Sequence, residues 1–341
     1  MDITFELPVW LVWFYHCMGT ISFLLNTFTI YLALFKSDTI DNFRYCILVF
    51  QLLCTLTDFY LTFLMQPIPL FPIIAGYCSG FLAVYLNAST HYLMVCRRFF
   101  LVILLKTEDL AGIQIYRNEN FAFMMASMSA QMEWLVYCFI KKHQTIGKIL
   151  STHIIPAKLF FVGEAGIPVL PVAVFVLYSM AGMDREEQLG YVLENYPQFF
   201  AGFTSLSNFA IYTLNFWFLL IAAVSLIGGL ICGLVFTYST LDMFKMLRSV
   251  QRRISTASYN RHEAAVKSLL AQFSVTSLCV GPPVMFVVVV MSKFRYAQVT
   301  VQLLLAIFAS HSSVNALVLV ATTPPFRNFV LRPIFIVKQV W

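Results

Sequence analysis

Three carboxylic acids lie inside long apolar runs of this chain, and they are the first candidates for chemistry. They are Asp58, Glu133 and Glu164. An acid costs roughly 2.5–3.5 kcal/mol to place at the centre of a hydrocarbon layer, so it is kept where it has a partner or a task. Glu133 and Glu164 fall at comparable depths in neighbouring runs. This is consistent with contact with an amine ligand or a shared proton, and at least equally with a protonated structural carboxyl.

Asp58 is expected to form a polar core with Asn26 and Asn315. At ~1.5 Å rise per residue, Asn26 and Asn315 fall at similar depth, whereas Asp58 falls roughly a turn or more away. The spacing predicts contact through water or a shifted helix, not a direct triad. A buried interhelical hydrogen bond worth ~0.6–2 kcal/mol, without a switching role, is the alternative.

The aromatic residues Tyr212, Phe216 and Trp217 are predicted to line a ligand pocket with the two glutamates. Packing against lipid is the alternative for each of them. The run Gly281-Pro282-Pro283 removes backbone hydrogen bonds, which predicts either a hinge or a static kink. Asn87-Ala-Ser89 is a glycosylation sequon on the face predicted to lie outside.

The sequence shows no enzyme signature. The six histidines are scattered without paired ligand spacing, and no pair among the eight cysteines has metal-ligand spacing. Walker loops, dinucleotide fingerprints and nucleophile elbows are absent from the sequence. We therefore predict no catalytic residue, no cofactor, no metal and no nucleic-acid partner. Cys78 has no evident disulfide partner, so no structural disulfide is expected there.

Composition indicates which solvent surrounds the helices that carry these residues. Of the residues, 60% are hydrophobic and only 11% are charged, against roughly 25% charged in soluble domains. Spans of about 20 apolar residues predict an all-α membrane protein, a seven-transmembrane helix bundle in a lipid bilayer. The predicted spans are 10–35, 45–65, 121–140, 154–180, 208–237, 266–291 and 299–321, with a cytoplasmic tail at 322–341.

Charge asymmetry sets the expected orientation. With seven spans and an outside N-terminus, the outer segments hold only Arg185, Lys293 and Arg295, while most other lysines and arginines lie inside. This fits the positive-inside rule. An eighth span would place the basic loop from Thr237 to Ala265 outside, so we reject it.

Several sequence blocks resemble one family. They are Thr57-Asp58 followed by Gln66-Pro-Ile-Pro-Leu-Phe-Pro72, Lys141-Lys142-His143-Gln144, Arg261 to Phe273, Ser310-His-Ser-Ser-Val-Asn315, and Thr323-Pro-Pro-Phe-Arg327. In this order they resemble the nematode serpentine receptor class I (Sri) chemoreceptors, with the related class H receptors as the nearest alternative. The resemblance covers nearly the whole chain.

The resemblance implies a rhodopsin-like architecture and a chemosensory receptor. Such a receptor would sense an unknown environmental small molecule at the plasma membrane of sensory cilia and signal to a heterotrimeric G protein. It also implies a switch role for the polar core and an inner G-protein face. The expected residues of that face are Lys141, Lys142, His143, Arg252, Arg253, Pro325 and Arg327. Attraction to anionic lipid, ~1 kcal/mol per basic residue, is the other reading. A multi-pass transporter or channel is the alternative function.

One departure from the family is large. The polar residues 95–120 interrupt what is a continuous third span in the family. They indicate an atypical insertion or a gene-model error, and a non-functional receptor is a further alternative. Tyr77 to Val95 is then expected as a non-spanning or re-entrant segment. A second choice keeps that run as the third span.

Overall fold

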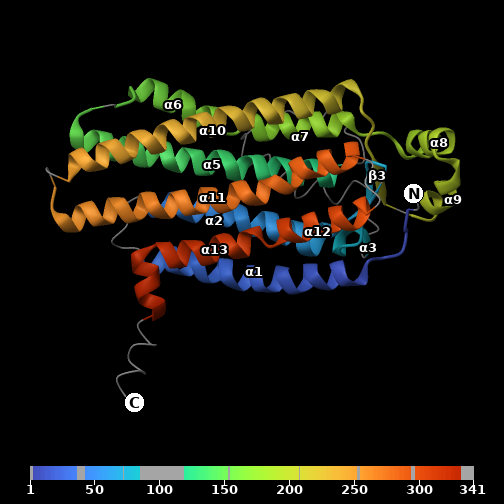
Figure 1. Cartoon of the computed structure of the whole chain (residues 1–341), viewed down its shortest axis with the longest axis horizontal. Helices are drawn as coiled ribbons and strands as arrows, with labels where there is room; N and C mark the ends of the chain where they lie inside the picture. Colours follow the sequence, from blue (N-terminus) through green and yellow to red (C-terminus); the bar gives the residue numbers. More distant parts are fainter. Residues whose placement is uncertain are drawn as a thin grey trace, which may run out of the picture.

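The computed structural model describes residues 3–36, 43–71, 73–84, 119–152, 154–206, 208–251, 254–292 and 296–331. Within these ranges, seven helical rods lie along a common direction (Figure 1). Their bounds are α1 Val9–Phe35, α2 Phe43–Phe59 with the π-helical extension η2 Tyr60–Met65, α5 Glu119–Leu150, α6 Ala157–Gly166 with α7 Val169–Ala181, α10 Phe216–Val250, α11 Thr256–Ser292, and α12 Ala297–Ala309 with α13 His311–Thr322.

The outer surface of the rods is apolar. Among the described residues, the five rods beginning with α1, α2, α6, α10 and α12 are long and apolar enough to cross a membrane. Helix α10 leaves 66%, 60% and 70% of Leu226, Leu230 and Leu234 exposed. Apolar surface costs about 25 cal/mol per Å² in water, so this helix requires lipid around it. Helix α5 instead packs against α2, α7, α10 and α11.

Local chemistry explains where the rods break. Pro168 between α6 and α7 has no N–H to continue the helical hydrogen bonds. The hydroxyl of Ser310, between α12 and α13, donates to the carbonyl of Ile307 at 2.7 Å. Extension η2 ends at Met65, and the next residue, Gln66, has a left-handed φ of 44°. The prolines that follow belong to a strand instead.

The helix ends differ from the predicted span ends. Helix α5 continues to Leu150 and α11 already begins at Thr256. Helix α10 begins at Phe216, later than the predicted residue 208, because residues before it pair in a sheet. Asn215 then caps α10 by accepting a hydrogen bond from the N–H of Phe218 at 2.9 Å. Most of the stretch 95–120, together with Asn87, lies outside the described residues.

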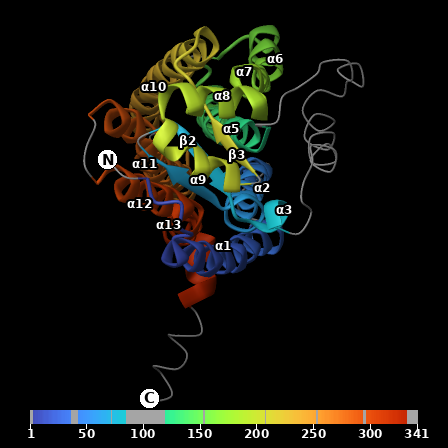
Figure 2. The same ribbon diagram turned by 90° about the vertical axis from the view of Figure 1, so that its right-hand side faces the viewer.

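One end of the bundle carries a small folded cap, which the sequence patterns do not predict. The cap comprises the antiparallel sheet β1 Pro67–Leu70, β2 Ala75–Cys78 and β3 Phe209–Ile211, together with α8 Arg185–Asn195 and α9 Phe200–Ser205. Pro67 pairs with Cys78, and Ala75 pairs with Ile211. Figure 2 shows α8, α9 and the strands lying over the ends of the rods. The short helix α3, Phe81–Val84, follows β2.

The N-terminal segment completes the cap. Ile3 is buried in an apolar cluster with Leu70, Val192, Phe203 and Ile211. The ring of Phe5 packs edge-on against Phe203, with centroids 5.2 Å apart. We call this end of the bundle the cap end. The opposite end, where α5 turns into α6 and where residues 324–331 form a short helix, is the basic end.

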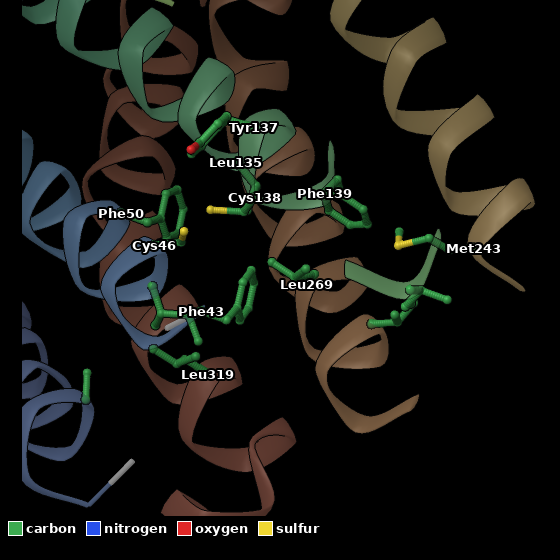
Figure 3. Packing of buried hydrophobic residues seen from close by; sticks show 14 of the residues in the cluster. Phe43, Cys46, Phe50, Leu135, Tyr137, Cys138, Phe139, Met243, Leu269 and Leu319 are labelled. Carbon is green, nitrogen blue, oxygen red and sulfur yellow. The ribbon is translucent and has the colours of Figure 1, made fainter. Parts of the chain in front are cut away.

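Two large buried apolar clusters fill most of the bundle. The basic-end cluster joins α2, α5, α10, α11 and α13, and Figure 3 shows Phe43, Cys46, Cys138, Phe139 and Leu269 within it. The cap-side cluster gathers aromatic and methionine side chains, among them Tyr60, Phe123, Met128, Tyr178 and Tyr212. Polar side chains that carry the candidate site lie between these two clusters.

Candidate functional site

A buried polar network joins α1, α2 and α13. The hydroxyl of Ser22 donates to Oδ2 of Asp58, and the amide of Gln51 donates to Oδ1 of Asn26. Asn26 in turn donates to Ser22 at 3.1 Å and to Ser312 at 2.7 Å. All five side chains are almost fully buried. Buried polar groups of this kind must be satisfied internally, so the network sets how these three helices meet.

The network extends to α5 through His311. Atom Nε2 of His311 lies 3.1 Å from Oε1 of Gln131, and Nδ1 lies 3.6 Å from Oδ1 of Asp58. Gln131 also donates to the hydroxyl of Thr57 at 2.5 Å. A single imidazole therefore lies between α2, α5 and α13.

The predicted core of Asn26, Asp58 and Asn315 is only partly assembled. Asn26 and Asp58 are connected through Ser22. The contact is therefore indirect, as expected, but a serine hydroxyl bridges the two residues instead of water. Asn315 lies apart, and its amide donates to Thr276 on α11 at 3.3 Å. Sequence reasoning missed Ser22, Gln51, Gln131 and Ser312, and it assigned no functional role to His311. Their polar character inside apolar runs was a usable signal, but it does not indicate which helix faces which.

A second polar patch ties α11 to α13 nearer the basic end. Ser268 accepts a hydrogen bond from Thr322 at 2.8 Å and lies 3.2 Å from the hydroxyl of Thr323. Gln272 also donates to Ser268, at 3.2 Å. Helix α11 runs uninterrupted through Gly281, Pro282 and Pro283, the predicted hinge.

The two glutamates do not meet. Glu164 accepts a hydrogen bond from the hydroxyl of Tyr137, which accepts one from Lys141 at 3.1 Å. Lys141 belongs to the basic half of α5, so Glu164 is held away from the cap-side cluster. Atom Oε2 of Glu133 is buried without a hydrogen-bond partner among the described residues. The described structure shows no hydrogen bond between the two acids, and a pocket that contains both stays a prediction.

The aromatic candidates also separate. Tyr212 is buried, its ring 6.2 Å from that of Tyr178, and its N–H donates to the carbonyl of Ile74 at 2.9 Å. Trp217 packs at the margin of the cap-side cluster. Phe216 is 69% exposed on the outer surface of α10. Phe216 is therefore a lipid-facing residue in this structure and not a pocket residue, because consecutive helical residues point in different directions.

The predicted G-protein face is partly buried. The ammonium of Lys142 lies 5.3 Å from the ring centroid of Phe43, and Lys142 is only 7% exposed. Atom Nε2 of His143 lies 2.7 Å from Oδ2 of Asp242 on α10. As surface contacts these two assignments are wrong here, because this face of α5 turns toward α2 and α10. Arg327 is exposed and Pro325 is half-buried, while Arg252 and Arg253 lie outside the described residues.

The cap offers little acid–base or metal-binding chemistry among the described residues. Burial raises the pKa of the Cys78 thiol to about 12, so the thiol stays protonated near neutral pH. Cys78 is a free cysteine. Within the described part of the chain, no group of three or more histidine, cysteine or acidic residues is arranged to hold a metal ion.

A seven-rod bundle in an apolar coat, with a buried polar network between its helices, is the architecture of rhodopsin-like seven-transmembrane proteins. The solved structure of squid rhodopsin matches 96% of this chain and 85% of its own, with a TM-score of 0.51 and 12% sequence identity. At this low sequence identity, the structural similarity establishes the fold alone.

The family is narrower than this class. Residues 1–111 and 108–330 match the model of the serpentine type 7TM GPCR chemoreceptor Sri, so the chain belongs to that family. The two matched segments meet inside the polar stretch 95–120. No curated protein matches the chain. The protein is thus a multi-pass membrane protein and a receptor of the G-protein-coupled type.

Proposed function

We propose that this protein is a chemosensory receptor that senses an environmental small molecule and signals to a heterotrimeric G protein. The observation that carries the proposal is the buried network of Ser22, Asn26, Asp58, Gln131 and His311. It joins helices between a cap-side aromatic cluster and the basic end. A ligand that favours one helix arrangement shifts the population toward it, and such a network gives the arrangements distinct energies.

The ligand region lies in the cap-side cluster. Tyr212 and Trp217 are its candidate contacts from the segment leading into α10. Glu133 follows Met128 of the same cluster by five positions on α5, and its unpartnered oxygen makes it a candidate polar contact. The cap covers this region, so a ligand reaches it by displacing cap side chains or by passing between rods.

The basic end is the proposed cytoplasmic face. It carries Lys141, Lys148 and Arg327. Arg252 and Arg253 lie outside the described residues and fall between α10 and α11 in the sequence. The positive-inside rule places this end in the cytoplasm and the cap outside. The family resemblance adds the plasma membrane of sensory cilia. Bending of α11 at Gly281–Pro283 would expose this face to a G protein. Lipid headgroups would contact the same face.

Nucleotide exchange tests the proposal directly. The full chain is reconstituted in lipid with a heterotrimeric G protein and exposed to a panel of volatile and water-soluble compounds. Compound-dependent exchange is the expected result. Ion current or solute flux in the same vesicles without exchange would overturn the proposal in favour of a channel or transporter. A matched variant lacking residues 95–120 separates the effect of that stretch from the receptor activity.

A further inference from the structure

Both nitrogens of the buried His311 face hydrogen-bond acceptors. Atom Nδ1 lies 3.1 Å from the backbone carbonyl oxygen of Phe308, and Nε2 lies 3.1 Å from Oε1 of Gln131. His311 is only 3% exposed. A neutral imidazole carries one N–H, so it would leave one nitrogen lone pair against an oxygen.

The orientation of Gln131 is set by its own partners. Its amide nitrogen lies 2.5 Å from the hydroxyl of Thr57 and 3.4 Å from the carbonyl of Leu53. Thr57 already donates its proton to the same carbonyl at 2.9 Å. Turning the amide over would place Oε1 against these oxygens. The atom that meets His311 is therefore the amide oxygen, which accepts.

A counter-charge lies beside the ring. Oδ1 of Asp58 lies 3.6 Å from Nδ1 of His311 and has no hydrogen-bond partner among the described residues. Oδ2 of Asp58 accepts from Ser22. Buried charges persist where they are paired and hydrogen-bonded. An imidazolium at His311 donates from both ring nitrogens to the acceptors that face them, and a carboxylate at Asp58 supplies the balancing charge.

We propose that the core of this receptor binds one proton, held on His311 and balanced by Asp58, and that this proton ties α13 to α2 and α5. Loss of the proton to solvent leaves one ring nitrogen facing an oxygen. Relief then requires Gln131 to turn, which breaks its contacts with Thr57 and Leu53. Among the described side chains, the titratable groups that approach this site are Asp58 and Cys54, both on α2.

Solid-state NMR of the full-length chain in lipid vesicles, with ¹⁵N-labelled histidine, tests the proposal without any agonist. Failure of this proposal is therefore distinguishable from failure of the receptor activity. We expect an imidazolium signal at neutral pH, where an exposed histidine with the ordinary pKa of ~6.5 is largely neutral. The signal should disappear in H311Q, and D58N should convert it to the neutral form at the same pH. A neutral His311 at that pH in the wild type would overturn the proposal.

Thermal unfolding measured as a function of pH is a second test, and it decides the question even if one variant folds poorly. The proton stabilises the described arrangement, so the stability is present at low pH and is lost as pH rises through release of the proton. The wild-type unfolding temperature should fall over that range. H16Q, which changes an exposed histidine on α1, should show the same fall, whereas D58N should flatten it. An equal fall in D58N and the wild type would reject the proposal.

Discussion

His143 on α5 and Asp242 on α10 form a buried contact, with Nε2 of the imidazole 2.7 Å from Oδ2 of the carboxylate. Gln144 sets the tautomer. Its Oε1 accepts from the N–H of Ile155 at 2.9 Å, so its amide nitrogen faces Nδ1 of His143 at 3.3 Å. Nδ1 therefore accepts and Nε2 donates, and a neutral imidazole satisfies both contacts. His311 has the opposite arrangement, with acceptors on both sides.

The first prediction concerns this contact. His143→Ala should lower the free energy of unfolding by about 1–3 kcal/mol, because a hydrogen bond to a buried carboxylate is lost. The measurement is thermal unfolding of the detergent-solubilised receptor. A double-mutant cycle with Asp242→Ala should show a coupling of about 0.5–3 kcal/mol. Additive effects of the two changes would mean that the contact contributes nothing.

A second prediction uses two glycines with opposite surroundings. A Cβ on Gly19 of α1 would overlap Oγ1 of Thr62 and lie 2.7 Å from Cε2 of Phe63. Gly19→Ala should therefore destabilise by about 1–3 kcal/mol through overpacking. A Cβ on Gly229 of α10 meets nothing within 4 Å. Gly229→Ala is the matched control, and it should be neutral or stabilising by up to ~1 kcal/mol. Equal effects on melting temperature would contradict this packing of α1.

The third prediction separates two neighbouring aromatic residues. Once an active compound is known, Tyr212→Leu should weaken its potency by about tenfold, equivalent to ~1.4 kcal/mol of contact energy. Phe216→Leu should leave potency unchanged, because that ring is exposed on the lipid side. Dose–response curves for nucleotide exchange measure both. A larger loss for Phe216→Leu would place the ligand outside the bundle.

The fourth prediction concerns topology. Epitope tags placed in the turn 151–156 and after the C-terminus should both be reached by antibody only after cells are permeabilised. A tag between α8 and α9 should be reached on intact cells. The physical reason is the gathering of basic residues at one end of the bundle. Tags at 151–156 and at the C-terminus found on opposite sides would end the seven-span arrangement.

The cap illustrates a feature that sequence patterns do not reveal. The sequence predicts that a span begins at residue 208, because Phe209–Ile211 is as apolar as the helix that follows it. The pairing of strand β3 with Ala75–Tyr77 depends on residues more than a hundred positions away. The prolines after Gln66 predicted the end of a helix, but the strand they form depends on that distant partner.

The sequence alone determined that lipid surrounds the helices and that the protein is a multi-span membrane protein. Apolar runs of membrane length and clustered positive charges have no stable alternative in water. The sequence also marked Asp58 and Asn26 as costly buried groups that need partners. Only the tertiary structure decided that Ser22 joins them and that His311 lies between Asp58 and Gln131. The rotation of each helix about its own axis is set by packing against all its neighbours at once. A polar residue therefore shows that a partner exists, while the assembled bundle selects which one.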